Sequence, residues 1–135
     1  MLAFTTGSHA CPSGFDPFFT EIQEVYNAIG YGLPKWPLPA PEEIADSRDE
    51  IQRSGYFDRV STARRVWTEE FSAAEYVALM NTASDHRLME PAARERLFAE
   101  MHRLINARPD GCITKHNLTI LRVARKKASV GDVTP

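Results

Sequence analysis

Apolar and polar positions along the chain predict three strands, and the clearest of them covers residues 113–125. Leu118 and Ile120 share one face of this strand in extended conformation. Leu121 and Val123 share the opposite face. A strand with apolar side chains on both faces is typical of a sheet that helices cover on both sides. We therefore predict that this last strand lies inside a sheet, with helices over both of its faces.

Two further stretches supply neighbours for the last strand. Residues 1–6 are mostly apolar or β-branched and precede a run of turn-forming residues, which predicts a short strand. Residues 56–67 mix aromatic, β-branched and polar residues, a composition typical of a strand near a sheet edge. Because the last strand needs a neighbour on each side, the predicted strand order is first, last, middle.

About four helices are predicted between these strands. They begin at residues 16, 42, 72 and 91. Asp16 and Pro17 supply a capping acceptor and a first-turn proline for a helix that extends to residue 29. Ser72 and Glu75 have the spacing of a capping box. Pro91 opens the helix with the most regular apolar face, whereas the second helix is polar.

The predicted connections are short, with one stiff exception. Residues 33–41 contain four prolines around Trp36, which predicts an extended loop that presents a large aromatic ring. Residues 84–90 are interpreted as a turn, and residues 128–135 as a polar tail. Together these elements predict a single α/β domain.

Composition and charge narrow the class of protein. The 135 residues are 43% hydrophobic and 25% charged, as in a globular domain. The net charge of −2 provides no general attraction for nucleic acid, and the basic cluster from Arg122 to Lys127 is interpreted as a solvated strand end. Two distant cysteines favour a reducing compartment, and no apolar run is long enough to span a membrane. We predict a cytoplasmic protein without a nucleic-acid or membrane partner.

Five segments together resemble a known family. Residues 55–67 form a strand that ends near a Trp, and residues 71–77 form a helix opened by Ser. Residues 81–84 place a Thr and a Ser at the end of that helix. Residues 88–97 begin the next helix, and residues 113–125 form a final strand. This order resembles the C-terminal part of a class I S-adenosylmethionine-dependent methyltransferase that acts on small molecules.

The resemblance implies a partial Rossmann-like methyltransferase fold over residues 1–127. In the family, the final strand lies antiparallel between the fifth and sixth strands, and residues 1–4 would correspond to the fifth. The implied ancestral reaction is methyl transfer from S-adenosylmethionine to a small molecule. Residues 7–54 would be a helical insertion that covers the substrate.

The sequence departs from the family where the cofactor binds. A class I methyltransferase uses a Gly-rich turn after its first strand and an acidic residue after its second. This chain contains neither a G-x-G-x-G nor a G-x-G-x-x-G motif. We therefore assign no cofactor-binding or catalytic residue. The chain is predicted to be inactive alone and not to bind S-adenosylmethionine alone.

The implied insertion supplies the candidate substrate site. Phe18, Tyr26 and Trp36 would form its wall, with His9 as a polar group near the mouth. The competing interpretation is that Phe18 and Tyr26 are ordinary core residues and that Trp36 only packs the proline-rich loop. The four histidines lack the spacing of metal ligands, so no metal site is predicted.

Two further alternatives remain open at this stage. Instead of a methyltransferase portion, the chain could be a small interaction domain that holds a partner protein through Trp36 and the helix over 16–29. The first strand, at residues 1–6, would have an open edge. That edge predicts either a homodimer or association with an N-terminal methyltransferase half. The competing interpretation is a monomer whose first residues fold back as a loop over the open edge.

Overall fold

The computed structural model describes residues 1–128 as three strands, five α-helices and one short 3-10 helix. In chain order these are β1 (Leu2–His9), α1 (Phe18–Ala28), η1 (Pro41–Glu43), α2 (Arg48–Arg53), β2 (Phe57–Ser72), α3 (Ala73–Thr82), α4 (Ser84–Arg87), α5 (Pro91–Asn106) and β3 (Cys112–Lys126). The predicted polar tail lies outside the described residues from position 129 onwards.

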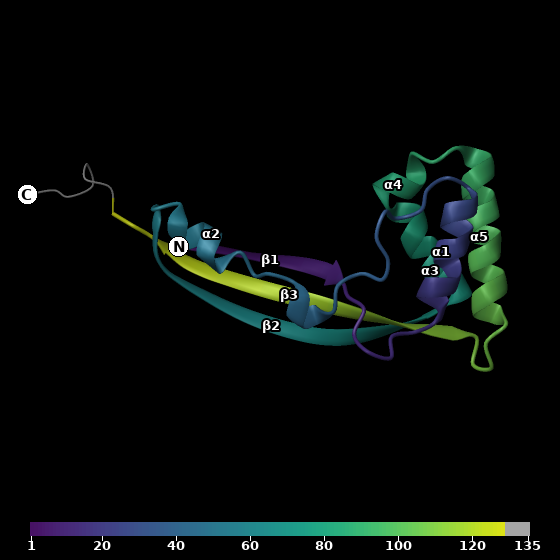
Figure 1. Ribbon diagram of the computed structural model, residues 1–135, viewed down its shortest axis with the longest axis horizontal. Helices are drawn as coiled ribbons and strands as arrows, with labels where there is room; N and C mark the ends of the chain where they lie inside the picture. The colour runs from purple at the N-terminus through teal and green to yellow at the C-terminus, as the bar shows by residue number, and fades with distance from the viewer. Residues whose placement is uncertain (129–135) are drawn as a thin grey trace, which may run out of the picture.

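The strands form one sheet in the order β1-β3-β2, in which β3 is antiparallel to both neighbours (Figure 1). Leu2 of β1 and Val60 of β2 both stand opposite Ala124 of β3. Since both neighbours are antiparallel to β3, β1 and β2 run in the same direction. The predicted α/β class and strand order, with the last strand central and antiparallel, are confirmed.

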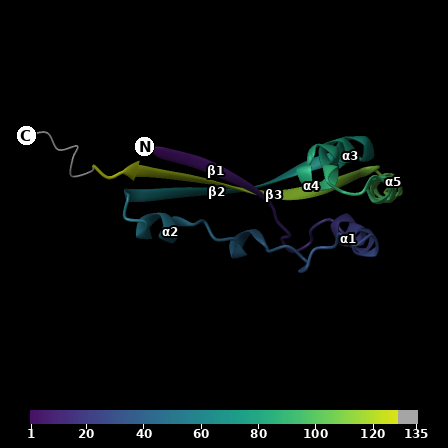
Figure 2. The same cartoon turned by 90° about the horizontal axis from the view of Figure 1, so that it is seen from above.

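Most helices gather at one end of a long sheet (Figure 1). β2 and β3 extend into this helical end, where α1, α3, α4 and α5 lie together (Figure 2). β2 is longer than predicted and continues directly into α3 at Ser72. Glu69 and Glu70 are weak strand formers, yet each pairs with a residue of β3. Cross-strand pairing therefore overrides local propensity here.

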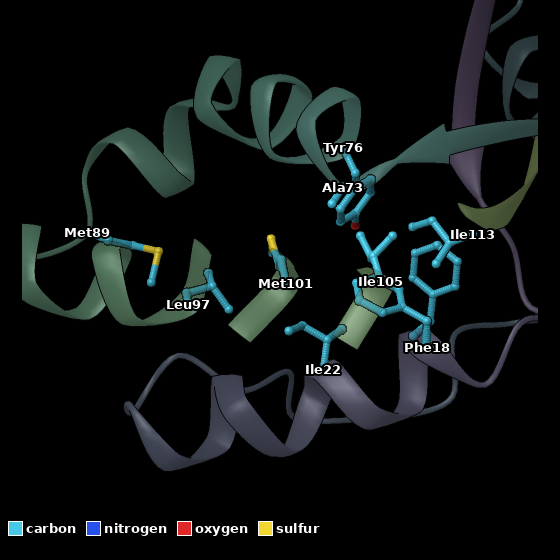
Figure 3. Close-up of a cluster of buried hydrophobic side chains, with 10 residues drawn as sticks. Phe18, Ile22, Ala73, Tyr76, Met89, Leu97, Met101, Ile105 and Ile113 are labelled. Atoms are coloured by element: carbon cyan, nitrogen blue, oxygen red, sulfur yellow. The ribbon is translucent and has the colours of Figure 1, made fainter. Parts of the chain in front are cut away.

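The main hydrophobic core lies between α1, α3, α5 and the adjoining strand ends (Figure 3). Its buried members are Phe18, Phe19, Ile22, Ala73, Tyr76, Met89, Leu97, Met101, Ile105 and Ile113. Helical spacing places Leu97, Met101 and Ile105 on one face of α5, where all three are fully buried. At the start of α3 the Ser72 side chain accepts a hydrogen bond from the Glu75 backbone N–H at 3.2 Å, which confirms the predicted cap.

A second, smaller core covers only one face of the part of the sheet that lies away from the helical end. Leu118 and Ile120 pack there with Ala10 and Ile44. In Figure 2, η1 and α2 lie along this face, and no described helix lies on the opposite one. Leu121, on that opposite face, is 38% exposed. The expectation that helices cover both faces of the last strand is therefore wrong for this half.

Length explains the incomplete cover. The 15 residues of β3 span about 50 Å at about 3.4 Å per residue. The 16 residues of α5, the longest described helix, span only about 24 Å. One group of helices at the end of the sheet is thus too short to cover the whole of β3.

Arg122 is buried, contrary to its interpretation as part of a solvated strand end. Its side chain is on the same face as Ile120, and the residue is 4% exposed. The guanidinium donates to Thr6 Oγ1 at 2.7 Å and to the Asp46 carbonyl. It also lies 5.2 Å from the centroid of the Phe4 ring. A buried cation requires such partners, so Arg122 links the sheet to the segment that precedes α2.

Two other segments differ from prediction. The helix expected over 42–54 is divided into η1 and the short α2, because Ser47 adopts a left-handed conformation with φ 65° between them. No residue of α2 is buried, so tertiary packing does not extend it. The turn expected over 84–90 contains α4, and Met89 after it joins the main core.

The outer edge of β1 is the least protected part of the sheet. β1 contains no Asp, Glu, Lys or Arg. β2, the other edge strand, carries Asp58, Arg59, Arg64, Arg65, Glu69 and Glu70. Charged side chains discourage edge-to-edge pairing, and β1 lacks this protection. We expect two chains to pair through β1 across a two-fold axis, which would make one continuous sheet.

Light scattering after size exclusion tests this pairing, and the expected mass is twice the 15.2 kDa of one chain. Thr5→Lys places a charge in the middle of β1 and should give a monomer. Ser61→Lys, a matched change in β2, should leave the dimer intact. A wild-type monomer at tens of micromolar, with β1 amides protected from hydrogen exchange, would contradict the expectation.

Candidate functional site

A cavity of about 260 Å³ opens at the helical end of the sheet, between α1, the loop after it, the end of β1 and α4. Apolar side chains form most of its wall. These are Phe19, Ile22, Tyr31, Leu33, Leu38 and Tyr76, together with the ring of Trp36. The polar groups come from His9, Gln23, Tyr26, Asp85 and His86. Few polar groups in an apolar hollow are typical of a site for a small ligand.

The end of α1 turns the chain back over this cavity. Gly30 has φ 85°, a left-handed conformation that side chains rarely adopt. The Tyr31 N–H then donates to the Tyr26 carbonyl at 2.8 Å, and the Gly30 N–H donates to the Asn27 carbonyl at 3.2 Å. This bond pattern is a Schellman helix end. It places Tyr31 Oη where it accepts from the Glu90 backbone N–H at 3.3 Å, which joins the loop to the start of α5.

Trp36 is held by two contacts, one with α1 and one with the segment before it. Its indole N–H donates to Thr20 Oγ1 at 3.1 Å. Its ring meets the Phe15 ring edge-on, with the centroids 6.0 Å apart. Pro34 and Pro37 restrict the backbone on both sides of it. The half-buried ring thus serves as a cavity wall, with its only donor already used.

His9 is an uncharged polar group of the cavity. It ends β1 opposite Asn117, and its ring packs edge-on against Phe19 with the centroids 4.5 Å apart. Burial, together with smaller effects of the nearby Lys115 and His116, lowers the pKa of His9 to about 4. At neutral pH the ring is therefore neutral and offers one donor and one acceptor.

Tyr26, His86 and Asp85 form a hydrogen-bonded chain along one wall. Tyr26 Oη lies 2.6 Å from His86 Nε2, and His86 Nδ1 lies 2.8 Å from Asp85 Oδ1. The His86 ring is buried and stacks on Phe98 with an interplanar angle of 20°. Burial raises the pKa of Tyr26, with Tyr76 and Asp85 adding to the effect, so its hydroxyl stays protonated.

Three of the four predicted site residues line this one cavity: His9, Tyr26 and Trp36. Phe18 does not. It is fully buried in the main core, where its ring meets Tyr76 at 5.5 Å (Figure 3). Successive residues of a helix point about 100° apart, so Phe19 faces the cavity when Phe18 faces the core. The structure thus corrects the placement of Phe18 as a wall residue.

Sequence reasoning missed Asp85 and His86. The spacing of the histidines excludes a metal site and suggests no other role for His86. An Asp directly before a His was the available signal. Tyr26, the third member of the chain, is 60 residues away in the sequence, and no local pattern connects residues at that distance.

Other classes of site receive no support from the described part of the chain. Residues 1–128 contain no group of three His, Cys, Asp or Glu side chains that could hold a metal ion. None of the helices described there is long and apolar enough to cross a membrane. Comparison of the chain with known protein families and with curated proteins finds no match. A functional assignment must therefore be argued from the cavity.

Proposed function

We propose that this chain is the C-terminal, substrate-binding portion of an S-adenosylmethionine-dependent small-molecule methyltransferase. The observation that carries the proposal is the cavity. The insertion between β1 and β2 provides most of its wall, and the family resemblance assigns substrate cover to residues 7–54. The position of β3, antiparallel between two strands of common direction, agrees with the family's final strand.

The lining of the cavity indicates a small and largely apolar acceptor molecule. Aromatic rings make up much of the wall, and no Lys or Arg of residues 1–128 lines it. His9 is neutral there because burial holds its pKa at about 4. An anionic ligand would find no opposite charge there, and the largely apolar wall favours an uncharged molecule.

The described residues do not fit the cofactor. S-adenosylmethionine carries a carboxylate, which needs cationic side chains or free backbone N–H groups. The N-terminus of α1 is already occupied by Asp16, whose carboxylate accepts from the Phe18 N–H at 3.0 Å and from the Thr114 N–H at 2.9 Å. A second polypeptide, such as a methyltransferase N-terminal half, would have to supply the cofactor site. We therefore propose that the chain is inactive alone.

A small interaction domain is the second candidate, and the uncharged edge of β1 is the observation that favours it. Such an edge accepts a strand from another protein through backbone hydrogen bonds. The sequence predicts a partner on Trp36 and α1, but Trp36 is already bonded to Thr20 and packed on Phe15. On this alternative the cavity would bind nothing and β1 would hold the partner.

A calorimetric titration tests the proposal. We expect benzofuran, an uncharged bicyclic aromatic, to bind with a Kd of about 1 mM or tighter. A Kd of about 1 mM corresponds to a binding free energy of about −4 kcal/mol. Trp36→Ala removes part of the wall and should weaken this binding about tenfold. Trp67→Phe changes the other tryptophan, which does not line the cavity, and should have no effect.

S-adenosylmethionine, titrated in parallel, is expected not to bind. A Kd below about 10 μM, which corresponds to a binding free energy of about −7 kcal/mol, would contradict this part of the proposal. Benzofuran binding that Trp36→Ala leaves unchanged, or no binding at all, would contradict the assignment of the cavity.

A further inference from the structure

Asp85, His86 and Tyr26 form a hydrogen-bonded chain at the wall of the cavity. All three residues line the cavity, so the chain ends at a surface that a ligand can reach. Asp85 is at one end, with its side chain 81% exposed, and the buried ring of His86 joins it to Tyr26. The positions of the hydrogens along the chain follow from the chemistry of each group.

The Asp85 carboxylate determines the first hydrogen. Burial tends to raise the pKa of Asp85, but the hydrogen bonds that it accepts from the His86 ring and backbone outweigh burial and hold this pKa below its usual value. An ionised carboxylate can only accept hydrogen bonds. His86 Nδ1, 2.8 Å from Asp85 Oδ1, must therefore carry a hydrogen and donate it.

The second hydrogen follows from the first. A neutral imidazole with a hydrogen on Nδ1 has a lone pair on Nε2. The Tyr26 hydroxyl, 2.6 Å from Nε2, must then donate its single hydrogen to His86. Tyr26 Oη keeps only lone pairs for the cavity, so it can accept a hydrogen bond there and cannot donate one.

Two other polar groups at the wall differ from this fixed acceptor, because the Gln23 amide and the neutral His9 ring can each donate as well as accept. Trp36 donates its indole N–H to Thr20 and offers only its ring to the cavity. His9 is neutral, and no described Lys or Arg lines the wall. The Asp85 carboxylate is 81% exposed, so water screens its charge. A ligand in contact with Tyr26 therefore gains most if it is flat, uncharged and carries a donor.

We infer that the Asp85–His86–Tyr26 chain makes Tyr26 Oη a fixed hydrogen-bond acceptor, and that the cavity selects an uncharged aromatic compound with an N–H or O–H donor. Tyr26 contacts the ligand, whereas Asp85 and His86 are positioning residues that act through it. This inference rests on the proposed function, because it names the class of molecule that the same cavity takes.

Indole and benzofuran form a matched pair of probes, since they have nearly the same shape and only indole has an N–H donor. The titration follows the Trp36 side-chain N–H in proton–nitrogen correlation spectra, at a mildly alkaline pH that keeps imidazoles neutral. Trp67 serves as the internal control. We expect indole to bind about fivefold more tightly than benzofuran, the ratio that one neutral hydrogen bond provides.

Two variants test the roles within the chain. Tyr26→Phe keeps the ring and removes the acceptor, so the two probes should bind equally while benzofuran affinity stays the same. Asp85→Ala should reduce the preference for indole to below about twofold, because His86 is then free to exchange tautomers. Thermal melts of both variants check that they are folded.

The tautomer of His86 provides a readout that a merely structural role would not affect. Long-range proton–nitrogen spectra, assigned with His86→Gln, should show the hydrogen on Nδ1 in the wild type and a mixture in Asp85→Ala. A hydrogen on Nε2 in the wild type would overturn the inference. The inference would also be overturned if the wild type shows no preference for indole, or if the preference survives Tyr26→Phe. In either case, benzofuran binding would leave the proposed function intact. If neither probe binds, both proposals fail.

Discussion

Leu97→Asp is expected to abolish folding. Leu97 is fully buried on the inner face of α5, in the core that joins α1, α3 and the strand ends. An Asp there would bury a carboxylate among apolar side chains, at a cost of several kcal/mol against a total stability of about 5–15 kcal/mol. Circular dichroism and a thermal melt should show no cooperative transition.

Leu88→Asp is the matched control for this change. Leu88 precedes α5 and is 85% exposed, so the new carboxylate stays in water. The free energy of unfolding of this variant should lie within about 0.5 kcal/mol of the wild-type value, as for most surface substitutions. A cooperative melt of the Leu97→Asp protein would mean that α5 does not pack on the core through this face.

Phe18→Ala is expected to destabilise the protein by about 3–5 kcal/mol, the usual cost of truncating a buried Phe. Phe18 is fully buried, and its ring packs against Phe19 and Tyr76 at centroid distances of 5.2 and 5.5 Å. Urea denaturation measures the change directly. The result decides whether Phe18 is a core residue or part of the ligand site.

Ligand affinity provides the control for Phe18. Because Phe18 does not line the cavity, the folded fraction of Phe18→Ala should bind benzofuran about as well as the wild type. Tyr26→Phe, a change within the cavity, should cost far less stability because it leaves no void. If Phe18→Ala is as stable as the wild type and no longer binds benzofuran, Phe18 belongs to the ligand site.

The features that sequence reasoning predicted correctly depend on contacts between near neighbours or on a strong local pattern. The helix cap at Ser72 and the apolar face of α5 involve residues three or four positions apart. The order of the strands followed from a single property of β3, whose apolar residues on both faces required a neighbour on each side. The predicted association of His9, Tyr26 and Trp36 depended instead on the family resemblance, and these residues do line one cavity.

Tertiary packing decided the remaining features. The choice between Phe18 and Phe19 as the cavity residue depends on the rotation of α1 about its axis, which its contacts with α3 and α5 determine. Arg122 is buried because the segment before α2 crosses the sheet above it. The chain from Asp85 to Tyr26 depends on the contact between His86 of α4 and Tyr26 of α1, which are 60 positions apart in the sequence. Periodicity reports which face of an element is apolar, but it carries no information on which distant element will cover that face, because that choice depends on the shape and length of the whole fold.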